Sequence, residues 1–280
     1  MILFNGQLRD TLPISDRGLQ YGDGVWETIR IKNHQAMLLE QHLERLQLGV
    51  KTLALQNFDI NALRQEIKTL QSQQKEAVLK IIISRGSGGR GYNPIGINTP
   101  ASRIVSLHPL PDYPKSYYQE GIQLTLCRTR LAHNPILAGF KHLNCLNYIM
   151  ARAEFSEPYQ EGLVRDYQGH IIEGTMSNVF IIKDNTLYTP QLDACGIKGV
   201  MQNSLIKQLA TLPQTEIKLV WKANISVSDI QQADAVFITN SIIGIWAVKS
   251  FSVIDAHLKS VDYAPHPLIQ QLQNTVERYI

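Results

Sequence analysis

The feature that most constrains the fold is an apolar run, AVLKIIIS, at residues 77–84. Its β-branched residues favour a strand, and its nearly unbroken hydrophobicity predicts burial on both faces. Two amphipathic patterns precede it, at residues 39–54 and 61–74, and each predicts a helix. The N-terminal part of the chain is therefore expected to be an α/β domain.

The rest of the chain predicts more strands and one boundary. Asn5-Gly6 predicts a hairpin turn within residues 1–12. Further strands are expected at residues 25–32, 102–109, 122–127, 162–166, 170–172, 178–182, 186–189 and 235–239. Prolines at 109, 111 and 114 form the most linker-like stretch. We therefore expect a small α/β domain at 1–113, a linker at 114–120 and a larger domain at 121–280.

Composition excludes some classes of protein. The 280 residues are 44% hydrophobic and 18% charged, which is ordinary for a soluble globular chain. A net charge of +3 is compatible with small anionic substrates but does not favour nucleic acid binding. We expect no signal peptide and no membrane span, and hence a cytoplasmic protein. Three widely spaced cysteines, Cys127, Cys145 and Cys195, suit neither a disulfide framework nor a zinc site.

The stretch NPILAGFKHLNCLNYIMARAE, residues 134–154, contains the first candidate catalytic residue, Lys141. Apolar residues recur at helical spacing, which predicts an amphipathic helix beginning at Lys141 with one face in a core. A lysine in an apolar setting at a helix N-terminus is expected to have a lowered pKa and to act as a nucleophilic amine. The alternative is an ordinary surface lysine.

Two glycine-containing loops are candidate anion sites. The loop RGSGGRGYNP, from residue 85, could present Arg85 and Arg90 to carboxylates or phosphates, or it could be an exposed lid. The stretch GIKGVMQNS, from residue 196, predicts a turn whose Val200 and Met201 amides enter a helix and cradle an anion.

Two polar residues follow predicted strands. Ser241 could add a hydroxyl to an anion site or could cap the next segment. Glu173 ends an apolar strand, and its carboxylate is either an exposed charge or a partner for a protonated nitrogen. None of these features is decisive by itself.

Together, these features resemble the fold-type IV enzymes that use pyridoxal 5′-phosphate (PLP), a family of branched-chain and D-amino acid aminotransferases and aminodeoxychorismate lyases. The resemblance covers nearly the whole chain through SDRGLQYGDGVWETIR, HLERL, FKHLN, EGTMSNVF, GIKGVM and TNSIIGIWAV. It implies two α/β domains, a smaller N-terminal one and a larger C-terminal mixed-sheet one, with the cofactor between them. It also implies a homodimer.

The resemblance implies a role for each matching residue. Lys141 is expected to form the Schiff base with PLP, and Glu173 to face the pyridine nitrogen. The phosphate is expected to be held by Arg45, the Val200 and Met201 amides, Asn240 and Ser241.

The closest likeness is to the lyase branch, through ISRGSGGRGY, AGFKHLN and Asn240-Ser241. This implies elimination of pyruvate from 4-amino-4-deoxychorismate to give 4-aminobenzoate for folate synthesis. Thr28 is then the expected hydroxyl donor, and the candidate substrate contacts are Arg90, Tyr92, Arg30 and Trp26.

Trp26-Glu27 instead matches the aminotransferase pattern, so a D-amino or branched-chain aminotransferase is the first alternative. The second alternative is a non-catalytic anion-binding or scaffolding protein that retains the fold.

Overall fold

The computed structural model describes residues 1–209, 218–253 and 260–280. The chain divides into two compact units: unit 1 comprises Met1–Pro111, Phe140–Asn144 and Tyr279–Ile280, and unit 2 comprises Asp112–Gly139 and Cys145–Arg278. The division falls after Pro111. The expected linker at 114–120 lies within unit 2 and includes helix α4 (Ser116–Gln119).

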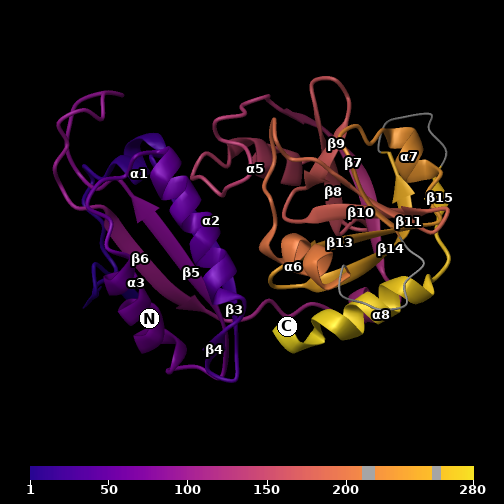
Figure 1. Ribbon diagram of the computed structural model, residues 1–280, viewed down its shortest axis with the longest axis horizontal. Coiled ribbons are helices and arrows are strands. Elements are labelled where there is room, and N and C mark those ends of the chain that lie inside the picture. The colour runs from indigo at the N-terminus through magenta and orange to yellow at the C-terminus, as the bar shows by residue number, and fades with distance from the viewer. Residues whose placement is uncertain (210–217, 254–259) are drawn as a thin grey trace. The chain divides into compact units, whose positions relative to one another are not determined.

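Unit 1 contains a six-stranded antiparallel sheet with the strand order β2-β1-β6-β5-β3-β4 (Figure 1). The predicted Asn5-Gly6 turn joins the first two strands, and both of its residues have positive φ angles, of 49° and 79°. The strands are β1 (Ile2–Phe4), β2 (Gln7–Leu8), β3 (Gly24–Lys32), β4 (Gln35–Ala36), β5 (Glu76–Ser84) and β6 (Ser102–His108).

The helices of unit 1 explain which face of the sheet is buried. They are α1 (Arg17–Tyr21), α2 (Leu39–Thr52) and α3 (Ile60–Gln71), and α2 packs on β3 while α3 packs on β6. Side chains alternate along a strand, so Val25, Ile29 and Ile31 are buried while Trp26 and Thr28 remain half-buried on the other face.

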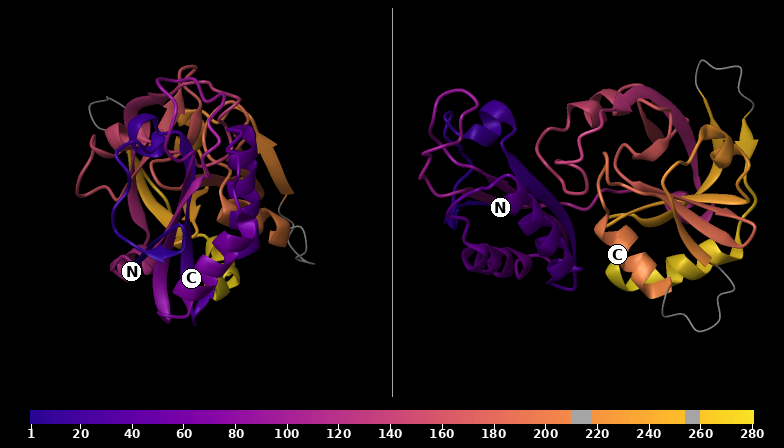
Figure 2. Two further views of the ribbon diagram at one scale, coloured as in Figure 1. Left: turned by 90° about the vertical axis from the view of Figure 1, so that its left-hand side faces the viewer. Right: turned by 45° about the horizontal axis from the view of Figure 1, so that its top comes forward.

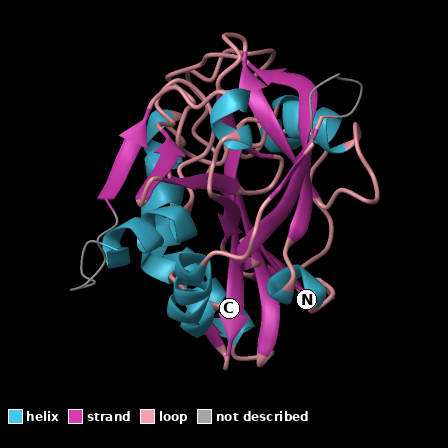
Figure 3. Ribbon diagram, turned by 90° about the vertical axis from the view of Figure 1, so that its right-hand side faces the viewer, coloured by secondary structure: helices cyan, strands magenta, loops and turns pink. Residues whose placement is uncertain are grey.

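Unit 2 contains a mixed sheet with the strand order β12-β11-β10-β13-β14-β7-β8-β9, and β15 pairs with β14. Its strands are among those drawn as arrows in Figure 2 and in magenta in Figure 3. Strand β9 stands at the opposite end of this order from β11 and β10 but also contacts both, which shows that the sheet curls. The strands are β7 (Ile122–Leu131), β8 (Glu161–Asp166), β9 (Ile171–Gly174), β10 (Asn178–Lys183), β11 (Thr186–Pro190), β12 (Lys218–Lys222), β13 (Ala235–Asn240), β14 (Gly244–Ser252) and β15 (Val261–Asp262).

Helices and aromatic side chains cover this sheet. Helix α5 contacts β7, α6 contacts β13 and α8 contacts β14, and the buried Trp246 ring receives Tyr113, Tyr117 and Tyr118 edge-on. The remaining helices of unit 2 are α5 (Leu146–Arg152), α6 (Val200–Leu209), α7 (Val227–Gln231) and α8 (Pro267–Val276). The 3-10 helix η1 (Glu277–Tyr279) follows α8, and its last residue, Tyr279, is assigned to unit 1. None of the helices built from described residues is long and apolar enough to cross a membrane.

The prediction that a helix begins at Lys141 is wrong. Helix α5 begins only at Leu146, and residues 140–144 are not helical: His142 forms an isolated bridge with Val25 of β3, and two backbone hydrogen bonds join this segment to β3. The expected apolar core face also fails, because Leu146, Ile149 and Met150 are 72%, 61% and 61% exposed. Backbone pairing with a distant strand overrides the local helical pattern here, and it also places residues 140–144 in unit 1 instead of the second domain.

Candidate active site

Lys141 is fixed by the first residues of β3. The Trp26 amide donates to the Lys141 carbonyl at 3.0 Å, and the Trp26 indole Nε1–H donates to the His142 carbonyl at 3.1 Å. The Lys141 Nζ lies 3.9 Å from the centroid of the Trp26 ring. The ring thus bounds one side of the amine.

A second lysine shares the same ring. Lys80 stands opposite Thr28 in the β3–β5 register, and its Nζ lies 5.4 Å from the Trp26 centroid. The half-buried face of β3 therefore brings Trp26, Thr28, Lys80 and Lys141 together. Our sequence reasoning missed Lys80, although one lysine within an otherwise apolar strand was the available signal.

Arg45, on α2, lies against a buried carboxylate. Its Nε and Nη2 donate to the two Glu27 oxygens at 2.7 and 2.6 Å, and His42 Nδ1 lies 2.7 Å from Glu27 Oε2. Burial by itself raises the pKa of Glu27, but the charges and hydrogen bonds of Arg45 and His42 outweigh it and lower that pKa to about 2. Glu27 therefore orients Arg45, whose expected role as a phosphate ligand remains a prediction.

The two arginines of the loop after β5 have different surroundings. Arg85 makes a two-pronged ion pair with Asp23, at 2.7 and 3.0 Å, and also donates to the carbonyls of Leu53 and Ala54. Arg85 therefore anchors the start of the loop and is not presented to a ligand. This corrects the expectation that Arg85 could bind a carboxylate or phosphate. Arg90 is exposed.

The other expected substrate contacts are also described. Tyr92 is 87% exposed, and its ring packs edge-on against Tyr21 with centroids 5.7 Å apart. Arg30 lies on β3 and makes a 3.0 Å ion pair with Glu76. Its guanidinium therefore already has a carboxylate partner.

In unit 2, Glu173 lies on β9 and is only 3% exposed. Tyr148 Oη donates to its Oε1 at 2.6 Å, and the Ile197 amide donates to its Oε2 at 3.1 Å. Burial and the Glu173 carboxylate raise the pKa of Tyr148 well above its usual value, so the phenol stays protonated and remains a donor. Sequence reasoning missed Tyr148, the one aromatic residue with a polar tip on α5.

The turn before α6 packs closely on β10. The Asn178 side-chain amide donates to the Ile197 carbonyl at 2.8 Å, and a Cβ at Gly199 would lie 1.8 Å from Asn178 Oδ1. Only glycine fits at that position. Helix α6 then begins at Val200, and the amides of a first helical turn, here those of Val200 and Met201, have no acceptor within the helix. This is the arrangement that suits an anion.

Asn240 and Ser241 follow β13. Asn240 Oδ1 accepts from the amides of Ile242 and Ile243 at 2.8 and 2.9 Å, and its Nδ2 donates to the Met176 carbonyl at 3.0 Å. Asn240 therefore joins its own turn, which contains Ser241, to the turn that follows Glu173.

The candidate residues thus form two groups. Unit 1 contains Lys141, the β3 and α2 residues Trp26, Thr28, Arg30 and Arg45, and the loop residues Arg90 and Tyr92. Unit 2 brings together the carboxylate, the helix start and the adjoining turn, namely Glu173, Val200, Met201, Asn240 and Ser241. Their joint role in one site remains a prediction.

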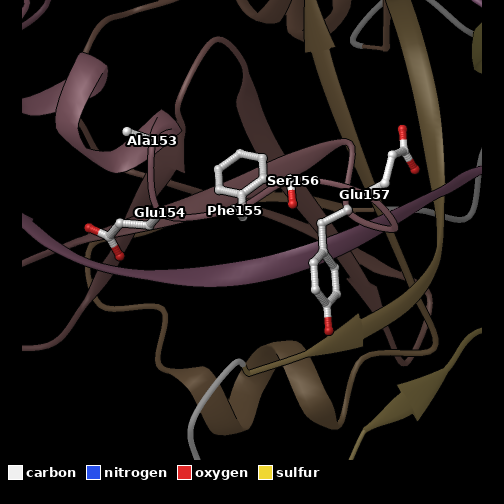
Figure 4. Close-up of a pocket in the computed structure, with 6 residues that line it drawn as sticks. Ala153, Glu154, Phe155, Ser156 and Glu157 are labelled. Carbon is white, nitrogen blue, oxygen red and sulfur yellow. The ribbon is translucent and has the colours of Figure 1, made fainter.

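A separate hollow of about 220 Å³ lies after α5 (Figure 4). It is lined by Ala153, Glu154, Phe155, Ser156, Glu157 and Tyr159. None of the candidate site residues lines it. Glu154 and Glu157 point away from each other in Figure 4, so the hollow does not concentrate charge.

Comparisons with known proteins agree with this architecture. The chain is 34% identical to the aminodeoxychorismate lyase of Vibrio harveyi over 277 residues, which cover 99% of each chain. The crystal structure of 4-amino-4-deoxychorismate lyase from Pseudomonas aeruginosa matches with a TM-score of 0.90 and 37% identity, over 99% of this chain and 98% of that one.

A PLP-bound hypothetical aminotransferase from Mycobacterium tuberculosis shares the fold, with a TM-score of 0.82 and 21% identity over 100% of this chain and 98% of that one. The sequence model of amino-transferase class IV matches residues 24–251. With the family's pattern extending over most of its length, this protein belongs to the class IV aminotransferase family.

Proposed function

We propose that the protein is a PLP-dependent carbon–oxygen lyase that converts 4-amino-4-deoxychorismate into 4-aminobenzoate and pyruvate. The observation that carries the proposal is Glu173, a buried carboxylate held by Tyr148 and the Ile197 amide. A carboxylate in this setting suits the protonated nitrogen of a pyridine ring. The lyases that are 34% and 37% identical to the chain favour this reaction over the others known in the family.

The residues present fit PLP. The Lys141 amine would bind it covalently, Glu173 would hold its ring nitrogen, and the Val200 and Met201 amides would hold its phosphate. Arg45 and Ser241 would add a guanidinium and a hydroxyl to the phosphate site, with Asn240 supporting the turn. When bound, PLP acts as an electron acceptor for negative charge formed at the substrate carbon.

The chain's own residues would then move protons and bind carboxylates. The Lys141 Nζ would take the proton from the ring carbon that bears the amino group. As the bond to the enolpyruvyl oxygen breaks, the Thr28 hydroxyl would donate to that oxygen or position it. Loss of this proton and of pyruvate leaves an aromatic ring, so the elimination is strongly downhill.

Substrate carboxylates need cations, and unit 1 offers several. Arg90 is the main candidate, with Tyr92 and Arg30 in support. Lys80 is an additional one, because it lies beside Thr28 and shares the Trp26 ring with Lys141. Trp26 would provide an apolar wall for the substrate ring.

The direct test is release of pyruvate from aminodeoxychorismate by the purified protein, followed with a coupled assay. The wild type is expected to release pyruvate and to show the visible absorbance of a lysine-bound PLP, and Lys141→Ala to lose both. Absence of that absorbance in the PLP-reconstituted wild type would contradict the proposal and favour a non-catalytic scaffold.

The second candidate function is an aminotransferase, favoured by Trp26-Glu27 at the start of β3. Formation of glutamate from 2-oxoglutarate and D-amino or branched-chain amino acids, without pyruvate release from aminodeoxychorismate, would establish it instead.

We also propose a cytoplasmic homodimer that contributes to folate synthesis. The support for the dimer is the outward apolar face of α5, formed by Leu146, Ile149 and Met150. Apolar side chains gathered on one exposed face mark a contact surface, and two-fold pairs are the commonest oligomers.

A further inference from the structure

Glu161 is a buried carboxylate to which the proposed mechanism gives no role. It is the first residue of β8 and is 0% exposed. A carboxylate removed from water needs several hydrogen bonds to offset its lost solvation. The question is what Glu161 holds in place.

Five donors converge on this side chain. Its Oε1 accepts from the Gly162 amide at 2.9 Å, the Thr175 amide at 3.1 Å and the Thr175 hydroxyl at 2.5 Å. Its Oε2 accepts from the Met176 amide at 3.1 Å and the Ser177 hydroxyl at 2.8 Å. Four of the five come from residues 175–177, the turn between β9 and β10.

That turn separates Glu173 from Asn178, the residue whose side-chain amide holds the turn before α6. Glu173 precedes it on β9, and Asn178 follows it on β10. The fit is close, because a Cβ at Gly174 would lie 2.8 Å from Glu161 Oε2 and 2.3 Å from the Ser177 hydroxyl. The carboxylate therefore fixes the backbone immediately beyond Glu173.

The same turn reaches the other end of the candidate site. Met176 donates its amide to Glu161, and its carbonyl accepts from Asn240 Nδ2 at 3.0 Å. Asn240 Oδ1 in turn accepts from the amides of Ile242 and Ile243, the two residues that follow Ser241 in the same turn. The Glu161 carboxylate thus holds a turn that follows Glu173 and that is hydrogen-bonded to the turn containing Ser241.

We propose that Glu161 is a positioning residue for the cofactor site: it holds the 175–177 turn so that Glu173 and the Asn240-Ser241 turn keep their geometry. This inference rests on the proposed binding of PLP. Glu161 does not touch the reacting groups. It acts through the turn, and displacement of a catalytic group by about 1 Å can cost about 100-fold in rate.

The test compares Glu161→Gln with a matched control, Glu154→Gln. Glu154 is another carboxylate of unit 2 that accepts from two amides and a hydroxyl, those of Arg128 and Thr129, but it supports β7 and not the 175–177 turn. Both variants are expected to lose thermal stability. Only Glu161→Gln is expected to raise the Kd for PLP, by about tenfold, and to lower kcat for pyruvate release by about tenfold to 100-fold with little change in KM.

Amide hydrogen exchange supplies a readout that needs no cofactor. In Glu161→Gln, exchange is expected to accelerate at residues 174–177, at the Ile197 amide that donates to Glu173, and at residues 242–243. In Glu154→Gln, it is expected to accelerate only near residues 128–129. Exchange therefore tests Glu161 even if the wild type binds no PLP, a result that would overturn the proposed function separately.

A milder pair covers the case in which Glu161→Gln does not fold. Thr175→Val removes one hydroxyl donor to Glu161, while Thr175→Ser keeps it. Weakened PLP binding in the valine variant, restored in the serine variant, supports the proposal. Wild-type PLP affinity, kcat and Ile197 exchange in the Glu161 variant, or in the valine variant if the former is unfolded, would show that Glu161 serves stability alone.

Discussion

The Lys141 Nζ lies 3.9 Å from the centroid of the Trp26 ring, and two hydrogen bonds from Trp26 fix the backbone of residues 141–142. The tryptophan therefore does two things: its ring faces the amine, and its N–H groups hold the segment that contains it. The segment is not helical and bridges β3 at His142, so its position depends on β3 and not on a helix of its own.

These two roles of Trp26 can be separated by substitution. Trp26→Phe keeps an aromatic face but removes the indole donor, whereas Trp26→Leu removes both. We expect pyruvate release to fall about tenfold in the phenylalanine variant and further in the leucine variant, because a misplaced amine transfers protons poorly. Equal rates in both variants and the wild type would show that the ring does not position Lys141.

The support of Glu173 gives a second prediction. Glu173→Gln is expected to lower kcat at least 100-fold, since an amide does not stabilise a protonated pyridine nitrogen as a carboxylate does. Tyr148→Phe is expected to cost about tenfold, because it removes one donor to that carboxylate. The control is Tyr159→Phe, because the Tyr159 hydroxyl contacts Ser252 and not Glu173. A control variant as impaired as Tyr148→Phe would argue against the specific role of Tyr148.

His42 predicts part of the pH dependence of stability. Burial lowers the pKa of His42 below its usual 6.5, with Arg45 and Lys141 acting in the same direction and Glu27 opposing them. The folded state therefore binds fewer protons than the unfolded state as the pH falls below 6.5, and the free energy of unfolding decreases there. Above that pH the contribution is fully present.

Urea titrations between about pH 5 and 7.5 measure this effect. We expect a weaker pH dependence in His42→Gln than in the wild type, although the variant is less stable at every pH. His34→Asn, in an exposed turn, is the control and is expected to keep the wild-type slope. An unchanged slope in His42→Gln would mean that His42 is not the titrating group.

Substitutions of Arg85 and Arg90 are expected to affect different properties, the first stability and the second substrate binding. Arg85→Lys is expected to lose about 2 kcal/mol of stability, because lysine cannot reproduce the paired contact with Asp23 and the donors to two carbonyls. Arg90→Ala is expected to leave thermal stability unchanged and to raise KM for aminodeoxychorismate. An unchanged KM in the Arg90 variant would contradict its assignment to a substrate carboxylate.

The apolar face of α5 predicts the oligomeric state. Ile149→Glu places a charge within this face and is expected to raise the dissociation constant of the dimer, as measured by sedimentation. Ile14→Glu, at a site that is 83% exposed in unit 1, is the control and is expected to leave it unchanged. A monomeric wild type at micromolar concentration would overturn the dimer proposal.

Most of the elements could be predicted from the sequence because local patterns determine them. The Asn5-Gly6 turn, strand 77–84 and helices α2 and α3 all follow from turn chemistry and hydrophobic period. The prediction failed at residues 134–154, where apolar spacing indicated a helix from Lys141. Its apolar residues face outward in α5, and periodicity cannot distinguish a face against a core from one that remains exposed.

The candidate residues divide along the same line. The sequence by itself determined the residue types, their order and the family resemblance, and with them it predicted Lys141, Glu173, Arg45 and the start of α6 as candidate site residues. Only the tertiary structure placed Trp26 and Lys80 near Lys141. It also showed that Arg45 pairs with Glu27 and Arg85 with Asp23. It further showed that Tyr148 donates to Glu173 and that Glu161 holds the turn after it. The physical reason is that hydrogen bonds and ion pairs between distant segments depend on strand pairing, which is long-range, whereas helix and turn preferences act over a few neighbouring residues.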